Sequence, residues 1–113
     1  MKKLSFVIPC YNSEHTIAHV VAEIDNCFSK NDRYEYEIVL VNDASPKDNT
    51  LGEIQRLARK NPRVIAVNLS KNFGQDSALM AGYSVAKGDY IVSLDDDGQN
   101  PAAEAYKLLD KLE

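Results

Sequence analysis

Four short apolar runs, rich in β-branched residues, are spaced along the chain. Each is almost continuously apolar, whereas a strand with one solvated face would alternate apolar and polar residues. A continuous run of this length is typical of a strand that is buried on both faces of a parallel sheet. The pattern predicts strands at residues 4–8, 36–41, 64–69 and 90–94.

Apolar residues recur at three- and four-residue spacing after each of these runs, which predicts amphipathic helices. Ser13 is expected to cap the first helix, and a capping box from Thr50 to Glu53 is expected to open the second. Gly88 is expected at the C′ position of the third helix, and Asn100 is expected to cap the fourth. The predicted helices cover residues 13–28, 50–60, 75–87 and 100–112.

Strands and helices therefore alternate four times, an order that favours right-handed crossovers and a three-layer α/β/α fold with a mostly parallel sheet. The length of 113 residues suits one domain covering residues 1–113. Because the sequence stops within or just after an amphipathic helix, we expect it to be part of a longer protein.

Composition narrows the function classes. The chain is 44% hydrophobic and 27% charged, with a net charge of −4 and no basic stripe, so nucleic acid is not an expected partner. Two cysteines without a C-x-x-C pair are expected to be buried thiols. No run approaches the ~20 apolar residues of a membrane span, and the expected location is cytoplasmic.

Polar residues follow every predicted strand, at the edge of the sheet where open α/β proteins bind ligands. The most distinctive segment is Asp95-Asp96-Asp97, because close carboxylates repel one another unless a cation compensates them. Oxygen ligands suit Mg²⁺ or Mn²⁺, and alternation along an extended segment places Asp95 and Asp97 on one side. Gln99 is a further neutral ligand on that side or part of the turn. The alternative is a solvated acidic loop that caps the next helix.

Three other side chains at these strand ends have two interpretations each. Asp43 either accepts hydrogen bonds from a nucleobase or caps the following turn. Lys71 either faces a diphosphate or is solvated, and Tyr11 either stacks on a ring or closes the core. The sequence contains neither G-x-G-x-x-G after the first strand nor a P-loop, so a bound phosphate would be neutralised by metal and lysine.

Four segments together resemble the donor-binding half of the family 2 glycosyltransferases, which are inverting, metal-dependent enzymes of the GT-A fold that use nucleotide sugars. The resemblance covers the entire chain, and residues 71–74 and 99–101 are further similar to polyprenyl-phosphate hexose synthases. Asn42, Ala44 and Lys71 depart from the commoner residues of the family. The four segments are residues 7–14, 41–45, 48–50 and 94–97.

The resemblance implies a role for each matching residue. Pro9, Tyr11 and Glu14 would border the nucleoside, and Asp43 would accept from the base. The catalytic and metal-binding residues would be Asp97 and Asp95, with Gln99 as a further metal ligand. Asp95 would also lie near the ribose, and Lys71 would contact phosphate.

The implied reaction is inverting transfer of a hexose from a nucleoside-diphosphate sugar, with UDP favoured over GDP, to an acceptor such as a polyprenyl phosphate. The acceptor-binding part lies downstream of the metal motif in this family, so we expect this chain to bind donor without transferring sugar alone. The longer protein is then expected at the cytoplasmic face of a membrane. Two alternatives remain: a non-catalytic nucleotide-binding module and a phospho-acceptor receiver domain.

Overall fold

The computed structural model describes residues 2–30, 33–44, 49–69 and 74–94. Within these ranges strands and helices alternate in the predicted order. The predicted fourth helix lies outside the described residues. The elements are β1 (Lys2–Cys10), α1 (Ile17–Phe28), β2 (Tyr34–Asn42), α2 (Thr50–Lys60), β3 (Val64–Asn68), α3 (Gln75–Val85) and β4 (Tyr90–Ser93).

The described strands form one parallel sheet in the order β3-β2-β1-β4. β1 lies inside the sheet, where it pairs with β2 from Lys2 to Cys10 and with β4 from Leu4 to Val7. A flavodoxin-like receiver domain has its third strand beside the first. Here β3 pairs with β2, so the strand order contradicts the receiver alternative.

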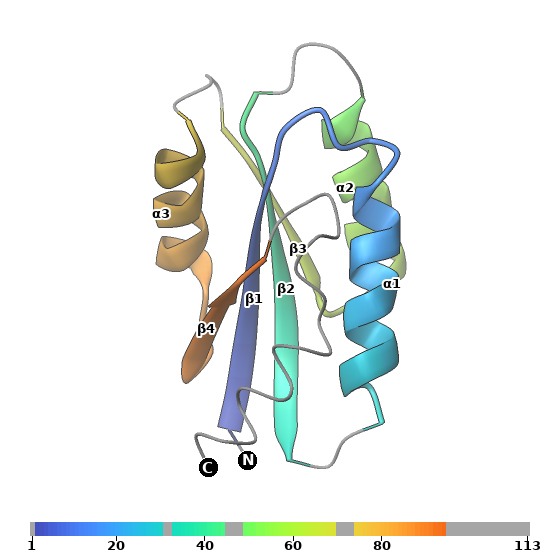
Figure 1. Cartoon of the computed structure of the whole chain (residues 1–113), viewed down its shortest axis with the longest axis vertical. Helices are drawn as coiled ribbons and strands as arrows, with labels where there is room; N and C mark the ends of the chain where they lie inside the picture. The colour runs from blue at the N-terminus through green and yellow to red at the C-terminus, as the bar shows by residue number, and fades with distance from the viewer. Residues whose placement is uncertain (1, 31–32, 45–48, 70–73, 95–113) are drawn as a thin grey trace.

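Helices cover both faces of the sheet, with α1 and α2 on one face and α3 on the other (Figure 1). The predicted three-layer α/β/α fold is therefore confirmed. Alternate residues of β1 and β2 enter two separate cores, as strands buried on both faces require. The core beneath α1 contains Phe6, Phe28 and Ile38, and the core beneath α3 contains Val7 and Val39.

A glycine lets α3 approach the sheet closely. A Cβ at Gly82 would overlap Cγ1 of Val7 and would lie 3.2 Å from Cγ2 of Val41. Both valines are fully buried, so neither has free space to move into. Gly82 thus sets the distance between α3 and the central strands.

The crossover from α3 to β4 is held by buried polar groups. The predicted end of the third helix at residue 87 is wrong. The helix ends at Val85 because Ala86 is extended (φ −63°, ψ 136°), so Gly88 is not its C′ residue. Instead Gly88 packs against β1, since a Cβ there would lie 2.5 Å from Oγ of Ser5. The backbone N–H groups that follow the helix therefore need acceptors from the sheet.

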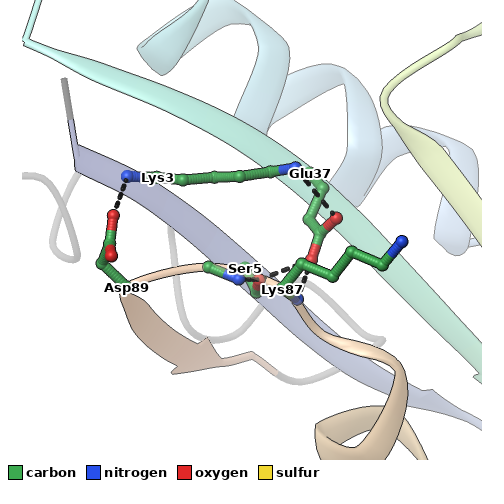
Figure 2. A network of polar contacts seen from close by, with 6 residues as sticks. Lys3, Ser5, Glu37, Lys87 and Asp89 are labelled. Carbon is green, nitrogen blue, oxygen red and sulfur yellow. Dashed lines mark hydrogen bonds and ion pairs between the residues drawn. The ribbon is translucent and has the colours of Figure 1, made fainter.

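Glu37 and Ser5 supply those acceptors (Figure 2). The Lys87 N–H donates to Glu37 Oε2 at 2.7 Å, and the Gly88 N–H donates to Ser5 Oγ at 2.8 Å. The Ser5 hydroxyl in turn donates to Glu37 Oε2 at 2.6 Å. Lys3 Nζ lies 3.4 Å from Glu37 Oε1. This polar network, here called the crossover network, fixes the start of β4.

The charge of Glu37 is stabilised although the side chain is buried. Burial by itself would raise the pKa of this carboxyl group. The hydrogen bonds from Lys87 and Ser5, together with the positive charge of Lys3, outweigh burial and lower the pKa. Glu37 is therefore a buried carboxylate that stays ionised around neutral pH.

The remaining fold predictions concern thiols and membrane spans. Cys10 is buried as expected, and Cys27 is half-buried. None of the helices in the described ranges has the length and apolar character needed to cross a bilayer.

Candidate functional site

The carboxyl ends of the strands converge at one edge of the sheet. Cys10 at the end of β1 is in register with Asn42 at the end of β2, and Asn42 with Asn68 at the end of β3. The Asn42 amide donates to the Asn68 side-chain oxygen at 2.9 Å. β1 lies between β2 and β4: the chain passes from β1 through α1 to β2, and it reaches β4 on the other side of β1 from β3 through α3. The edge beside β1 is thus the topological switch point at which open α/β sheets bind ligands.

β4 runs beside β1 toward this switch point. Ser93, the last residue of β4, is in register with Val7, and the Leu94 N–H donates to the Val7 carbonyl at 3.2 Å. Asp95 follows Leu94 directly in the sequence. The predicted residues Lys71, Asp95, Asp97 and Gln99 themselves lie outside the described residues.

The segment after β1 forms one side of the site. Pro9 is buried within β1 opposite Val41, whereas Tyr11 lies in the bend after the strand and is 44% exposed. Asn12 adopts a left-handed conformation (φ 52°), which asparagine tolerates better than most residues. The bend therefore leaves the Tyr11 ring accessible to a ligand.

The segment after β2 adds a buried carboxylate. The Asp43 N–H donates to the Cys10 carbonyl at 3.0 Å, which continues the pairing of β1 and β2 beyond the last strand residue. Asp43 is only 4% exposed. Asp43 and Tyr11 are therefore brought to neighbouring places at the same edge. Ala44 follows in the left-handed conformation (φ 51°).

Two hydrogen bonds join the segment after β1 to the start of α2, and the contacts there differ from the predicted helix caps. Asn49, not Thr50, caps α2, because the Asn49 side chain accepts from the Gly52 N–H at 3.2 Å. The Thr50 hydroxyl instead accepts from the Ser13 N–H at 2.8 Å. The Asn49 N–H donates to Glu14 Oε1 at 3.0 Å, so the carboxylate of Glu14 bridges the two segments.

The first turn of each helix differs from the prediction accordingly. Residues 13–16 form a hydrogen-bonded turn, and α1 begins only at Ile17 with Thr16 as its N-cap. Ser13 therefore does not cap α1. Glu53, expected to complete a capping box, is hydrogen-bonded by Arg56, and this lowers the pKa of its carboxyl group despite the opposing effect of burial.

Sequence reasoning missed the structural roles of Thr50, Asn49 and Asn68. Each acts through a partner that is at least 26 residues away in the sequence. No local pattern identifies such a pair. The sequence offered one indication of these roles: the predicted strands and helices place all three residues near the carboxyl ends of the strands.

A metal centre is not visible within the part of the chain that the structure describes. No group of three or more histidine, cysteine, aspartate or glutamate side chains gathers there in a way that could hold a metal ion. The predicted ligands Asp95, Asp97 and Gln99 are not among those residues.

Comparison with known proteins identifies the class. The sequence pattern described as "Glycosyl transferase family 2" matches residues 5–113, which is nearly the entire chain. The chain belongs to this family. The resemblance expected from the sequence is thereby confirmed.

Individual relatives are more specific. The chain is 37% identical over all its 113 residues to undecaprenyl-phosphate 4-deoxy-4-formamido-L-arabinose transferases from two strains of Klebsiella pneumoniae. It spans 34% of the length of these curated relatives.

Solved structures support the fold. A mannosyltransferase from Pyrobaculum calidifontis, solved with GDP-Man and Mn²⁺, has a TM-score of 0.74 and 26% identity over 85% of this chain and 28% of its own. S. aureus TarS 1-349, solved with UDP, has a TM-score of 0.74 and 24% identity over 96% of this chain and 32% of its own. Both likenesses confirm the predicted GT-A-like α/β fold.

Proposed function

We propose that this chain is the nucleotide-sugar-binding part of a glycosyltransferase that transfers a sugar to a polyprenyl phosphate. Family membership supports sugar transfer, and the Klebsiella relatives are named for an undecaprenyl-phosphate acceptor. The Pyrobaculum mannosyltransferase, at 26% identity, was solved with a nucleotide sugar and Mn²⁺.

One structural observation carries the proposal. Three segments that are far apart in the sequence approach the switch point: the bend after β1 and Asp43 after β2 lie there, and β4 points toward it, with Leu94 bonded to Val7 of β1. A nucleotide bound across this edge would meet an exposed ring, a buried carboxylate and the start of the acidic segment. That combination suits a base, a ribose and a diphosphate in one extended ligand.

The proposed contacts follow from these positions. Asp43 accepts hydrogen bonds from the base, and Pro9, Tyr11 and Glu14 border the nucleoside. Glu14 contributes through a carboxylate that already accepts the Asn49 N–H, so it is held in place before ligand arrives. Lys71 is the proposed phosphate contact.

The proposed metal is Mg²⁺ or Mn²⁺, held by Asp97 and Asp95 with Gln99 as a further ligand. These residues offer only oxygen donors of the kind that hard divalent cations prefer. Cys10, the cysteine at this edge, is buried, and its thiol donates to the Ile8 carbonyl, so no soft thiolate competes. A bound divalent metal would stabilise the negative charge that develops on the leaving diphosphate.

The proposed reaction inverts the anomeric carbon, because the acceptor approaches from the face opposite the diphosphate. A lipid phosphate is already anionic and needs no strong base, whereas a sugar hydroxyl would need one. The family resemblance implies a hexose, with UDP favoured over GDP. The Klebsiella relatives are named for an arabinose derivative and the Pyrobaculum enzyme for mannose. The test therefore uses donors that differ in both sugar and base.

The chain alone is proposed to bind donor without turnover, since it spans 34% of its curated relatives. The alternative is a non-catalytic nucleotide-binding module. A cytoplasmic location, with the longer protein at a membrane face, stays a prediction.

Thermal unfolding with and without ligand tests the proposal. At 100 times its dissociation constant, UDP or GDP with Mn²⁺ should stabilise the chain by ~2.7 kcal/mol, which raises the midpoint by about 10 °C or more. Asp97→Ala or EDTA should abolish the shift. Glu35→Ala, which removes an exposed carboxylate near the opposite end of the sheet, should retain it. If neither UDP nor GDP shifts the midpoint, the proposal is contradicted.

Catalysis is tested separately from binding. A longer protein that contains this chain should transfer sugar from UDP- or GDP-linked hexose or pentose donors to a polyprenyl phosphate. Nucleotide binding without transfer to any acceptor would favour the non-catalytic module.

A further inference from the structure

Thr50 occupies an unusual place for a threonine in the first turn of a helix. It is completely buried, yet its hydroxyl does not cap α2, because Asn49 already does so. The hydroxyl is instead directed to the segment after β1, where it accepts the Ser13 N–H at 2.8 Å. Ser13 is itself only 3% exposed. A buried N–H needs an acceptor, and Thr50 supplies it across 37 residues of sequence.

The contact is one half of a reciprocal pair. Thr50 accepts from the backbone of the first segment, and Glu14 of that segment accepts from the backbone N–H of Asn49, the residue before Thr50. Together these bonds join the bend after β1 to the N-terminus of α2. We call this pair of hydrogen bonds the loop clasp.

The loop clasp lies next to the left-handed residue of the bend. Asn12, directly before Ser13, has a positive φ of 52°, a conformation in which the chain reverses direction before Ser13. On the far side of Ser13, its carbonyl accepts from the N–H groups of Thr16 and Ile17 at 3.1 and 3.0 Å. Ser13, two residues after Tyr11, is therefore held through both its N–H and its carbonyl.

We propose that Thr50 is a positioning residue for nucleoside binding: its hydroxyl holds Ser13, and thereby the bend that presents Tyr11 to the nucleoside. This inference rests on the proposed function. Thr50 does not touch the nucleotide. It acts by keeping the bend in the binding conformation before ligand arrives, so that binding does not have to order it.

A matched pair of variants separates this role from simple packing. Thr50→Val keeps the shape of the side chain but removes the acceptor, and Thr50→Ser keeps the acceptor but removes a methyl group. We expect Thr50→Val to weaken UDP or GDP binding in the presence of Mn²⁺ about tenfold, measured by calorimetry. Thr50→Ser should bind within about twofold of the unaltered chain.

Two further measurements exclude a general loss of stability. Ile54→Val removes a methyl group from a fully buried residue of the same helix that is not part of the loop clasp. It should lower the unfolding midpoint yet leave nucleotide affinity unchanged. Amide hydrogen exchange of Ser13 in the ligand-free chain should accelerate in Thr50→Val and not in Thr50→Ser or Ile54→Val.

Each outcome has a definite meaning. Equal nucleotide affinity of Thr50→Val and the unaltered chain would overturn the positioning role while leaving the proposed function intact. Equal weakening by Thr50→Val and Thr50→Ser, or unchanged Ser13 exchange, would also overturn it, because the hydroxyl would then not be responsible. Failure of the unaltered chain to bind either nucleotide would overturn the proposed function and this role with it.

Discussion

Replacing Glu37 by glutamine tests the crossover network, because it removes one buried charge and keeps the shape of the side chain. Glu37 Oε2 accepts from Ser5 Oγ at 2.6 Å and from the Lys87 N–H at 2.7 Å. Hydrogen bonds to a charged acceptor contribute about 1.5–3 kcal/mol each, against about 1 kcal/mol for neutral ones. The half-exposed Lys3 adds little. We therefore expect Glu37→Gln to lower the free energy of unfolding at pH 7 by about 2 kcal/mol.

The stabilisation that the charge of Glu37 provides depends on pH. The pKa of Glu37 is lower in the folded chain than in the unfolded chain, where it is about 4.3. The stability from its charge is therefore present above about pH 4.3 and is lost as the pH falls through the folded pKa. The difference between Glu37→Gln and the unaltered chain should shrink accordingly below about pH 4.

Urea unfolding followed by far-ultraviolet circular dichroism, at steps from pH 7 to pH 3, measures both effects. Glu35→Gln is the matched control, since Glu35 lies on the same strand and is exposed. It should change stability by less than about 0.5 kcal/mol. A difference for Glu37→Gln that is absent at pH 7, or that stays constant down to pH 3, would refute the reasoning.

Three further substitutions test the packing of α3, the left-handed residue after β2 and one side-chain hydrogen bond, each by urea unfolding. Gly82→Ala should lower stability by about 1 kcal/mol or more, because the added Cβ meets Val7; a gain from the helix propensity of alanine would show that α3 can move away. Ala44→Gly should raise stability by about 0.5–1 kcal/mol, since φ is 51° there, and a loss would contradict the left-handed conformation. Tyr36→Phe should lower stability by about 1 kcal/mol, because the Tyr36 hydroxyl donates to Asp25 at 2.6 Å, and an unchanged midpoint would argue against that bond.

The elements were predictable because their patterns are local. The apolar runs located every described strand, and helical spacing located α1, α2 and α3. Strand lengths were underestimated where polar residues continue a ladder: β2 runs from Tyr34 to Asn42, two residues earlier and one later than its apolar run. Pairing with a neighbouring strand places such residues in β2, and hydropathy carries no information on that pairing.

The helix ends were less predictable because tertiary contacts decide them. Thr50 followed by Glu53 has the local pattern of a capping box, yet each side chain has another partner. Ser13 has the residue type of a cap, but a hydrogen-bonded turn follows it and α1 begins only at Ile17. Gly88 follows α3 as a C′ glycine would, but it is required by the close approach of Ser5.

The site was predictable as a location more than as a set of contacts. The rule that ligands bind at the carboxyl ends of strands placed Tyr11 and Asp43 at one edge, and the structure does the same. The bridging role of Glu14 depends on the distance between two loops, which the sequence does not contain. The roles of Asp95 and Asp97 stay predictions.

Paramagnetic broadening by Mn²⁺ tests the common site most directly. In ¹⁵N-labelled chain with UDP or GDP, stoichiometric Mn²⁺ should broaden the amide signals of the proposed ligands Asp95 and Asp97 most strongly, and those of Tyr11, Asp43 and Leu94 next, with Mg²⁺ as the diamagnetic reference. The signals of Lys3 and Glu37, in the crossover network, should broaden least. Strongest broadening at the crossover network, or equal broadening at both places, would contradict a single nucleotide and metal site at the switch point.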